Sequence, residues 1–212
     1  TLFSLLRLQP EGLKTNNLMN CLRFPYISSG LTPEQVNWLD FISRQLSITG
    51  GSEQWEEAWN ILQKEDATEK VDDEDGNQFL DYSCFPDSAE LLLLKNGLQA
   101  FLDNITPPQG NQQIPVWIAW LKGVCEKIQL RSHIRQEEES DYFALTACFE
   151  ELIIEDRMVP RQNIDYNDFL SALTETITAS ERSNPTQQFA NSIFIGEITW
   201  ARGIRFQAAA FL

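Results

Sequence analysis

The sequence predicts a mainly α-helical fold, a bundle of about seven or eight helices with a small remnant of parallel sheet at the carboxyl end. Apolar residues recur at helical spacing over most of the chain up to about residue 190. Helix-start residues such as Thr, Ser, Asp and Pro precede several of these segments. By contrast, β-branched apolar runs occur in the last stretch, Ser192 to Leu212.

Composition is that of a folded chain. The 212 residues are 42% hydrophobic and include six Trp and thirteen Phe, which is enough apolar material for a substantial core. A net charge of −15 opposes binding to a polyanion by the chain as a whole, although the sixteen Lys and Arg are unevenly spread and allow a local basic patch. The absence of an apolar run of about eighteen residues and of a leader leads us to expect no membrane contact and a cytoplasmic location.

The chain begins at Thr1 and stops within the apolar run Ala208 to Leu212. Natural domains seldom end on an unprotected strand. We therefore expect the chain to be a piece of a longer polypeptide.

The first helices follow from apolar spacing and from Pro. Thr1 to Leu8 is expected to be a buried helix, and Asn16 to Phe24 a second one with Thr15 as its N-cap and Pro25 forcing its end. The two should pack as a helical hairpin. Its expected contacts are Leu2, Leu5, Leu6, Leu18 and Leu22.

The next two helices have clear start signals. Thr32-Pro-Glu-Gln35 combines an N-cap, a Pro at the first helical position and a Gln able to close a capping box, so a helix should run to about Leu46. Gly50-Gly51 ends that segment, and Ser52 is expected to cap a helix from Glu53 to about Lys64.

An acidic insert from about residue 65 to 87 is predicted to be a solvated, mobile loop. Its centre is Asp72-Asp-Glu-Asp75-Gly76, which superficially resembles a calcium loop. Such a loop needs a ligand at its first position, where this chain has Val71, and a Glu six residues after the Gly, where it has Tyr82. We therefore expect no metal site here.

Two further helices are predicted after the insert. One is capped by Asp87 or Ser88 and runs through Leu102, and its Leu91 to Leu94 run indicates burial on all sides. The other opens at Pro115 and runs to about Ile134, with Gly123 expected to allow close helix packing.

The last two predicted helices carry wide apolar faces. Tyr142 to Asp156 is expected to turn Phe143 inward along with other apolar residues. Asp165 should cap the final helix. The inward stripe of that helix is expected to be Phe169, Leu170, Leu173 and Ile177.

Familiar catalytic patterns are missing from the sequence. It contains no Gly-x-x-x-x-Gly-Lys-Ser/Thr phosphate loop, no nucleophile elbow and no visible PD-(D/E)XK signature. The four cysteines form no Cys-x-x-Cys pair, and the single His133 has no ligand-spaced neighbour. Acidic neighbours such as Glu138-Glu139 and Glu150-Glu151 point to different helix faces and are interpreted as solvated. We expect no catalytic and no metal residues in this chain.

The carboxyl end offers one candidate binding site. Ile193 to Ile198 and Ala208 to Leu212 are typical of buried strands, and the loop between them carries Arg202 and Gly203. An α/β domain presents phosphate-binding groups in such loops, where Gly admits the phosphate and Arg supplies a bidentate cation. An ordinary strand connection with a solvated Arg is the other interpretation.

This stretch, Thr199-Trp-Ala-Arg202-Gly203-Ile-Arg205-Phe206, resembles the late helicase motif of UvrD/RecB-like superfamily 1 helicases, in particular the form in AddB-type helicase-nuclease subunits and related PD-(D/E)XK nuclease family proteins. Residues from about Leu2 to Trp59 are similar to the helical block of the same families. Where those helicases usually carry a Glu associated with the nucleotide, this chain has Arg205, so the resemblance does not carry a nucleotide contact to this position.

The resemblance implies a domain organisation and a function. Residues 1–190 would be the helical insertion of the second RecA-like domain, and residues 191–212 the start of its α/β segment. The complete protein would be an ATP- and Mg²⁺-dependent DNA helicase-nuclease subunit in double-strand-break repair and recombination, partnered by DNA and by other domains or a second subunit. Thr199, Arg202 and Gly203 would contact the DNA backbone. The alternative is a non-enzymatic acidic scaffold for protein-protein interaction.

Overall fold

The computed structural model describes residues 2–64, 84–158 and 162–183, and it is mainly helical, as the sequence predicts. In this part of the chain the β structure is one isolated antiparallel bridge, between Gln112 and Ile164. The predicted sheet remnant lies outside the described residues. The helices are α1 Leu2–Leu6, α2 Thr15–Leu22, α3 Pro33–Gln45, α4 Ser52–Lys64, α5 Ser88–Ile105, α6 Ile114–Lys127, α7 Leu130–His133, α8 Glu139–Met158 and α9 Tyr166–Ser183, with a 3-10 turn, η3, at Gln136–Glu138.

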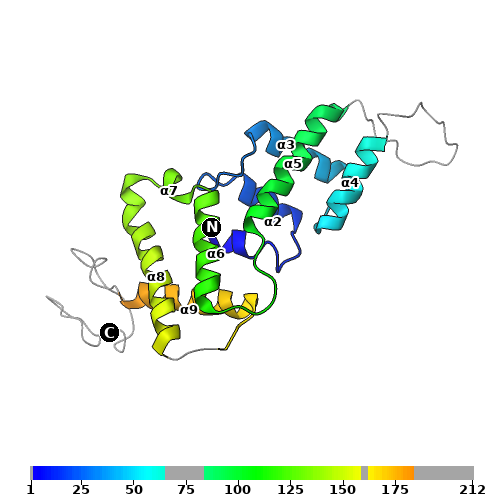
Figure 1. Ribbon diagram of the computed structural model, residues 1–212. Helices are drawn as coiled ribbons and strands as arrows, with labels where there is room; N and C mark the ends of the chain where they lie inside the picture. Colours follow the sequence, from blue (N-terminus) through cyan, green and yellow to red (C-terminus); the bar gives the residue numbers. More distant parts are fainter. Residues whose placement is uncertain (1, 65–83, 159–161, 184–212) are drawn as a thin grey trace, which may run out of the picture.

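A single hydrophobic core joins all of these helices. Figure 1 shows α3, α4 and α5 at one end of an elongated molecule and α6 to α9 at the other, with α9 crossing α8. Trp117 of α6 is fully buried and stacks on Phe169 of α9, with ring centroids 5.5 Å apart. The hydroxyl of Tyr166 donates to the carbonyl of Leu6 at 2.9 Å, so α9 is tied to α1.

Local start signals set the expected boundary of α3. The hydroxyl of Thr32 accepts from the N–H of Gln35 at 3.2 Å, and the Gln35 side chain accepts from the N–H of Thr32 at 2.9 Å. This reciprocal capping box satisfies two backbone donors that an isolated helix end leaves free. Asp87 and Asp165 cap α5 and α9 with a single side-chain bond each, accepting from a backbone N–H three residues on.

The prediction that Thr15 caps α2 is wrong. Thr15 is the first residue of the helix, and its hydroxyl donates to the carbonyl of Ile48 at 2.8 Å. The same tertiary contact brings Gly50 so close that an added Cβ would lie 2.9 Å from the carbonyl oxygen of Gly12. Ser52 likewise belongs to α4 as its first residue. The missing side chain of Gly50 therefore lets two chain segments touch.

Helix α5 is less buried than its leucine run suggests. Leu91 and Leu94 are buried, but Leu92 is 50% and Leu93 60% exposed, which corrects the expectation of a helix buried on all sides. Close packing occurs at Gly97, where an added Cβ would lie 2.4 Å from the Cδ2 of Leu31.

The single helix predicted from Pro115 to about Ile134 is broken. Gln129 adopts a left-handed conformation with φ of 53°, which separates α6 from the short α7. The interruption allows the N–H of Ser28 to bond the carbonyl of Ile128 at 2.8 Å. Close helix packing at Gly123 is not found, because nothing lies within 4 Å of a Cβ built there.

The acidic insert is mostly outside the described residues, namely 65–83. Its predicted carboxyl end is not a loop in solvent. Pro86 is buried, and the ring of Phe85 lies 5.5 Å from that of Phe41 on α3. Residues 84–87 therefore belong to the folded part and lead directly into α5.

Candidate functional site

The three residues that the sequence singles out, Thr199, Arg202 and Gly203, lie outside the described residues. The structure therefore does not show their surroundings. The described part of the chain carries four kinds of surface feature: a group of cations, two polar clusters, two hollows and an exposed apolar helix face.

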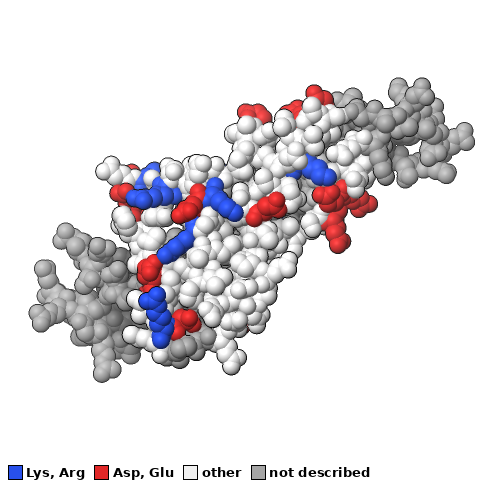
Figure 2. All heavy atoms as spheres, in the orientation of Figure 1, with Lys and Arg blue, Asp and Glu red and all other residues white. Residues whose placement is uncertain are grey.

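Cations gather in the half of the molecule built from α6, α7 and α8. Figure 2 shows most of the Lys and Arg side chains of this face there, with Asp and Glu among them. Lys122 pairs with Glu150 at 2.5 Å, and Arg135 pairs with Glu138. Lys127 and Arg131 are exposed, and no ion pair within the described residues engages either of them. These two side chains are available to an anionic partner.

A hollow of about 330 Å³ lies beside Arg131, at the start of α8. It offers a guanidinium, a carboxylate and an aromatic ring, a set suited to a polar side chain of a partner. The lining residues are Arg131, Ile134, Gln136, Glu139 and Tyr142.

A polar clasp holds the start of α8 to the loop after α2. The hydroxyl of Tyr26 donates to Oε1 of Glu138 at 2.6 Å, and the guanidinium of Arg135 donates to the same oxygen. These hydrogen bonds, from Arg135 first and then from Tyr26, lower the pKa of Glu138 from 4.5 to about 2. The pKa of Tyr26 is raised by the same carboxylate. Each group has its partner, so the clasp is structural.

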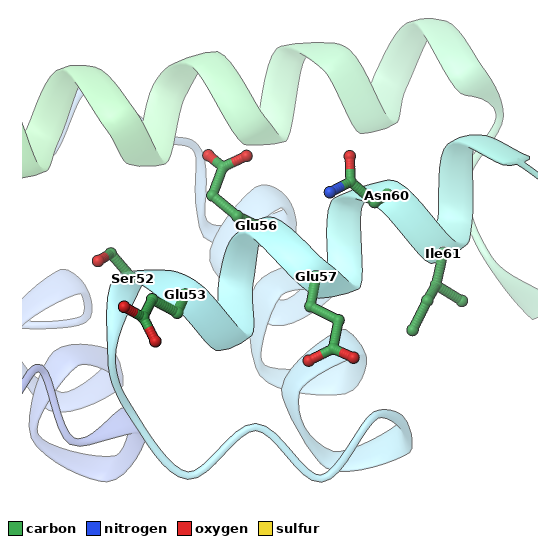
Figure 3. A pocket seen from close by; sticks show the side chains of 6 residues that line it. All are labelled: Ser52, Glu53, Glu56, Glu57, Asn60 and Ile61. Carbon is green, nitrogen blue, oxygen red and sulfur yellow. The ribbon is translucent and has the colours of Figure 1, made fainter.

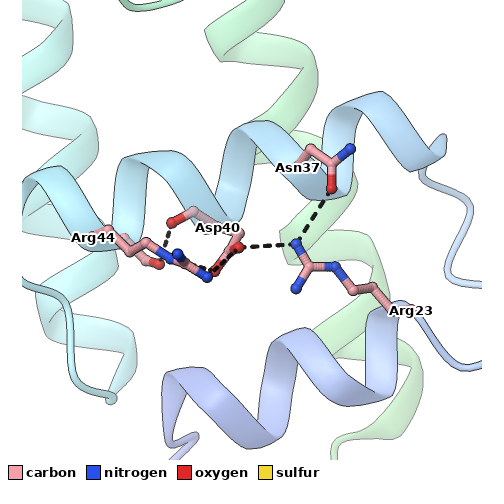
Figure 4. A network of polar contacts seen from close by, with 5 residues as sticks. Arg23, Asn37, Asp40 and Arg44 are labelled. Atoms are coloured by element: carbon pink, nitrogen blue, oxygen red, sulfur yellow. Dashed lines mark hydrogen bonds and ion pairs between the residues drawn. The ribbon is translucent and has the colours of Figure 1, made fainter.

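A second polar cluster joins α2 to α3. Asp40 accepts from Arg23 at 2.9 Å and from Arg44 at 2.8 Å, and Arg23 also donates to Asn37 (Figure 4). Partial burial alone would raise the pKa of Asp40, but the hydrogen bonds from the two arginines more than offset it, so the pKa is lowered. The Asp40 carboxylate therefore already has its hydrogen-bond partners within this cluster.

The hollow on α4 measures about 520 Å³ and is lined by one helix (Figure 3). Glu56 points toward α5, where it pairs with Lys95 at 3.1 Å, while Glu57 and Ile61 point to the other side of α4. Because these side chains point in different directions, they form an acidic surface but do not converge on one point where a ligand could bind. Its lining is Ser52, Glu53, Glu56, Glu57, Asn60 and Ile61.

The outer face of α8 is the feature that sequence reasoning missed. Phe143 was expected to point inward, yet it is 57% exposed, and Ile154 and Met158 are 50% and 78% exposed. With Ala147 these side chains form one stripe, because spacings of 4, 7 and 4 residues return to the same side of a helix of about 3.6 residues per turn, and Glu150, which pairs with Lys122, interrupts the stripe between Ala147 and Ile154. The opposite side buries Phe149 and Leu152. The sequence of α8 does carry a signal for this face, because its apolar residues recur at helical spacing on two sides of the helix instead of one.

Thiol and metal chemistry finds little support in the described residues. Burial raises the pKa of the Cys21 and Cys125 thiols to about 11, so both stay protonated and weakly nucleophilic at neutral pH. Within residues 2–64, 84–158 and 162–183, no three His, Cys, Asp or Glu side chains come close enough to hold a metal ion. No helix of that same part has the length and apolarity needed to cross a membrane.

Comparison of the chain with protein-family models, curated proteins and solved structures gives no match.

Proposed function

We propose that this chain is a helical domain of a DNA helicase-nuclease subunit that acts in double-strand-break repair and recombination. Its role there is to wall the DNA path and to contact neighbouring domains, without carrying out the chemistry. Thr199, Arg202 and Gly203 contact the DNA backbone. The support from the sequence is the late helicase motif around Arg202, which follows a helical region of the expected order.

The observation in the structure that supports this role most is the distribution of cations. The chain as a whole has a net charge of −15, yet Lys122, Lys127, Arg131 and Arg135 fall close together on α6, α7 and the turn that follows. Lys127 and Arg131 remain exposed, and Arg131 lines a hollow that also contains Tyr142. Cations beside an aromatic ring are what a DNA strand would meet on a protein wall.

ATP and Mg²⁺ would be bound elsewhere in the complete protein. The chain has no phosphate loop, and Arg205 stands where the helicase motif carries the Glu associated with the nucleotide. The residues of this chain therefore do not fit a nucleotide site, and no step of catalysis is assigned to them.

Salt-dependent DNA binding by the complete polypeptide tests the proposal. Replacing Arg202 with Ala removes one phosphate contact, so the slope of log K against log salt should shrink by about one unit and affinity should fall similarly for all sequences. Arg131→Ala should act in the same direction. Arg44→Ala, whose guanidinium pairs with Asp40 away from these residues, is the matched control. An unchanged slope for Arg202→Ala, with a lowered melting temperature, would show that Arg202 is structural.

A second candidate is a non-enzymatic scaffold that binds other proteins. The acidic surface of α4 and the exposed apolar stripe on α8 favour it. The measurements of salt-dependent DNA binding described above distinguish the helicase-nuclease domain from the scaffold. A scaffold with no DNA role should show no salt-dependent DNA affinity in the complete polypeptide.

A further inference from the structure

The outer face of α8 is an apolar surface that the described residues leave uncovered. Phe143, Ile154 and Met158 are each at least half exposed, with Ala147 and the ion-paired Glu150 between them. The inner face of the same helix buries Phe149 and Leu152 at 1% exposure each. A helix at the edge of a core needs only one apolar face, so a second face indicates a second contact.

The stripe is too small to hold a free partner well. A helix of 20 residues is about 30 Å long, and a strip about 10 Å wide along it covers about 300 Å². A stable interface between separate proteins buries about 800 Å² on each partner. A tethered segment needs far less area, because a short linker gives it an effective concentration in the millimolar range. This favours an occupant from the same chain over a second copy.

The chain that continues beyond α9 begins beside α8. The thiol of Cys148, near the middle of α8, donates to the hydroxyl of Ser180 at 3.3 Å, and α9 ends at Ser183. Nine residues lie between Ser183 and Ile193, and the ten Cα-to-Cα steps between these two positions can span up to about 33 Å. Every part of the stripe, from Phe143 to Met158, is therefore within reach of the segment that starts at Ser192.

The composition of that segment complements the stripe. Residues 192–212 are rich in Ile, Phe and Ala and carry two arginines, Arg202 and Arg205, against one glutamate, Glu197. The exposed residues next to the stripe on α8 include Glu151 and Glu155. Apolar side chains could cover the stripe while the arginines lie close to these carboxylates.

We propose that residues 192–212 dock on the outer face of α8, with their apolar side chains covering Phe143, Ile154 and Met158. This contact would fix the segment that carries Arg202 against the helical core. The inference does not depend on DNA binding, and it would hold for a scaffold as well as for a helicase domain.

Photo-crosslinking in the whole chain tests it directly. Phe143 is replaced by benzoylphenylalanine, which keeps an aromatic ring at that position, and the crosslinked peptides are identified by mass spectrometry. We expect crosslinks to residues 192–212. Leu93, 60% exposed on α5, is the matched control and should give none to that segment. Mixing isotope-labelled with unlabelled chains separates contacts within one chain from contacts between copies.

A second variant tests the apolar character of the contact. Ile195→Asp combined with Ile198→Asp should lower the yield of the Phe143 crosslink about tenfold, as expected if the contact loses at least about 1.4 kcal/mol. The melting temperature of the helical core reports whether the variant still folds. Crosslinks that join two copies would assign the stripe to a homodimer and overturn the proposal. A yield at residue 143 that matches the Leu93 control, or crosslinks to other segments, would overturn it as well.

Discussion

Helices α8 and α9 pack on each other but differ in the side chains that they expose to solvent. α9 buries Phe169 and Leu173 completely and exposes polar residues such as Asn167, Ser171 and Glu175. α8 buries Phe149 and Leu152 and exposes more apolar residues on its far side. The difference is that α9 turns polar residues to solvent, whereas α8 carries apolar side chains on both sides, which favours a second contact for α8.

The largest expected effect is on the inner face of α8. Phe149→Ala removes a ring that is 1% exposed and leaves a cavity, so the free energy of unfolding should fall by about 3–5 kcal/mol. Urea denaturation of the whole chain measures this value. A loss below about 1 kcal/mol would show that α8 does not belong to the core.

The same substitution on the outer face makes the comparison quantitative. Phe143→Ala should lower the free energy of unfolding by about 1 kcal/mol if residues 192–212 cover the ring. A side chain in open solvent would change stability by less than about 0.5 kcal/mol. Urea denaturation at two protein concentrations gives the value, and a dependence on concentration would point to a second copy.

The smallest effect is expected at the polar clasp that begins α8. The pKa of Glu138 is about 2 in the folded chain against an ordinary 4.5, so its charge stabilises the fold above pH 4.5, and this contribution is lost as the pH falls toward 2. Glu138→Gln should flatten the dependence of melting temperature on pH across that window. Glu137→Gln, an exposed neighbouring carboxylate outside the clasp, is the control. Equal curves for the wild type and Glu138→Gln would contradict the clasp.

Local chemistry made the helical class and several boundaries predictable. Thr32, Pro33 and Gln35 form the expected capping box, and Asp165 caps α9, because these interactions involve residues three positions apart. Trp117 and Phe169 follow from apolar spacing, which identifies the side of a helix that enters a core.

The wrong predictions concern residues whose conformation or burial is set by tertiary contacts and not by neighbouring residues in the sequence. Thr15 bonds Ile48, which lies 33 residues away, and no local pattern indicates that contact. Gln129 takes a left-handed conformation that breaks an otherwise continuous helical pattern. Phe143 and Phe149 are the same residue type in the same predicted helix. Only their positions around α8 decide that Phe149 is buried and Phe143 exposed. The candidate site around Arg202 depends on residues outside the described ranges, so it remains a prediction from the motif.

Thiol labelling of a single cysteine tests most directly whether the outer face of α8 is covered. Ile154→Cys and Leu93→Cys place a thiol at positions where the native side chains are 50% and 60% exposed, and peptide mass spectrometry follows each rate in the whole chain. If residues 192–212 occupy the stripe, the thiol at position 154 should react about tenfold more slowly than the thiol at position 93, since the segment must open first. The difference should disappear when Ile195→Asp and Ile198→Asp are added. Equal rates at the two positions in the unaltered segment would contradict the proposal that α8 is covered by its own chain.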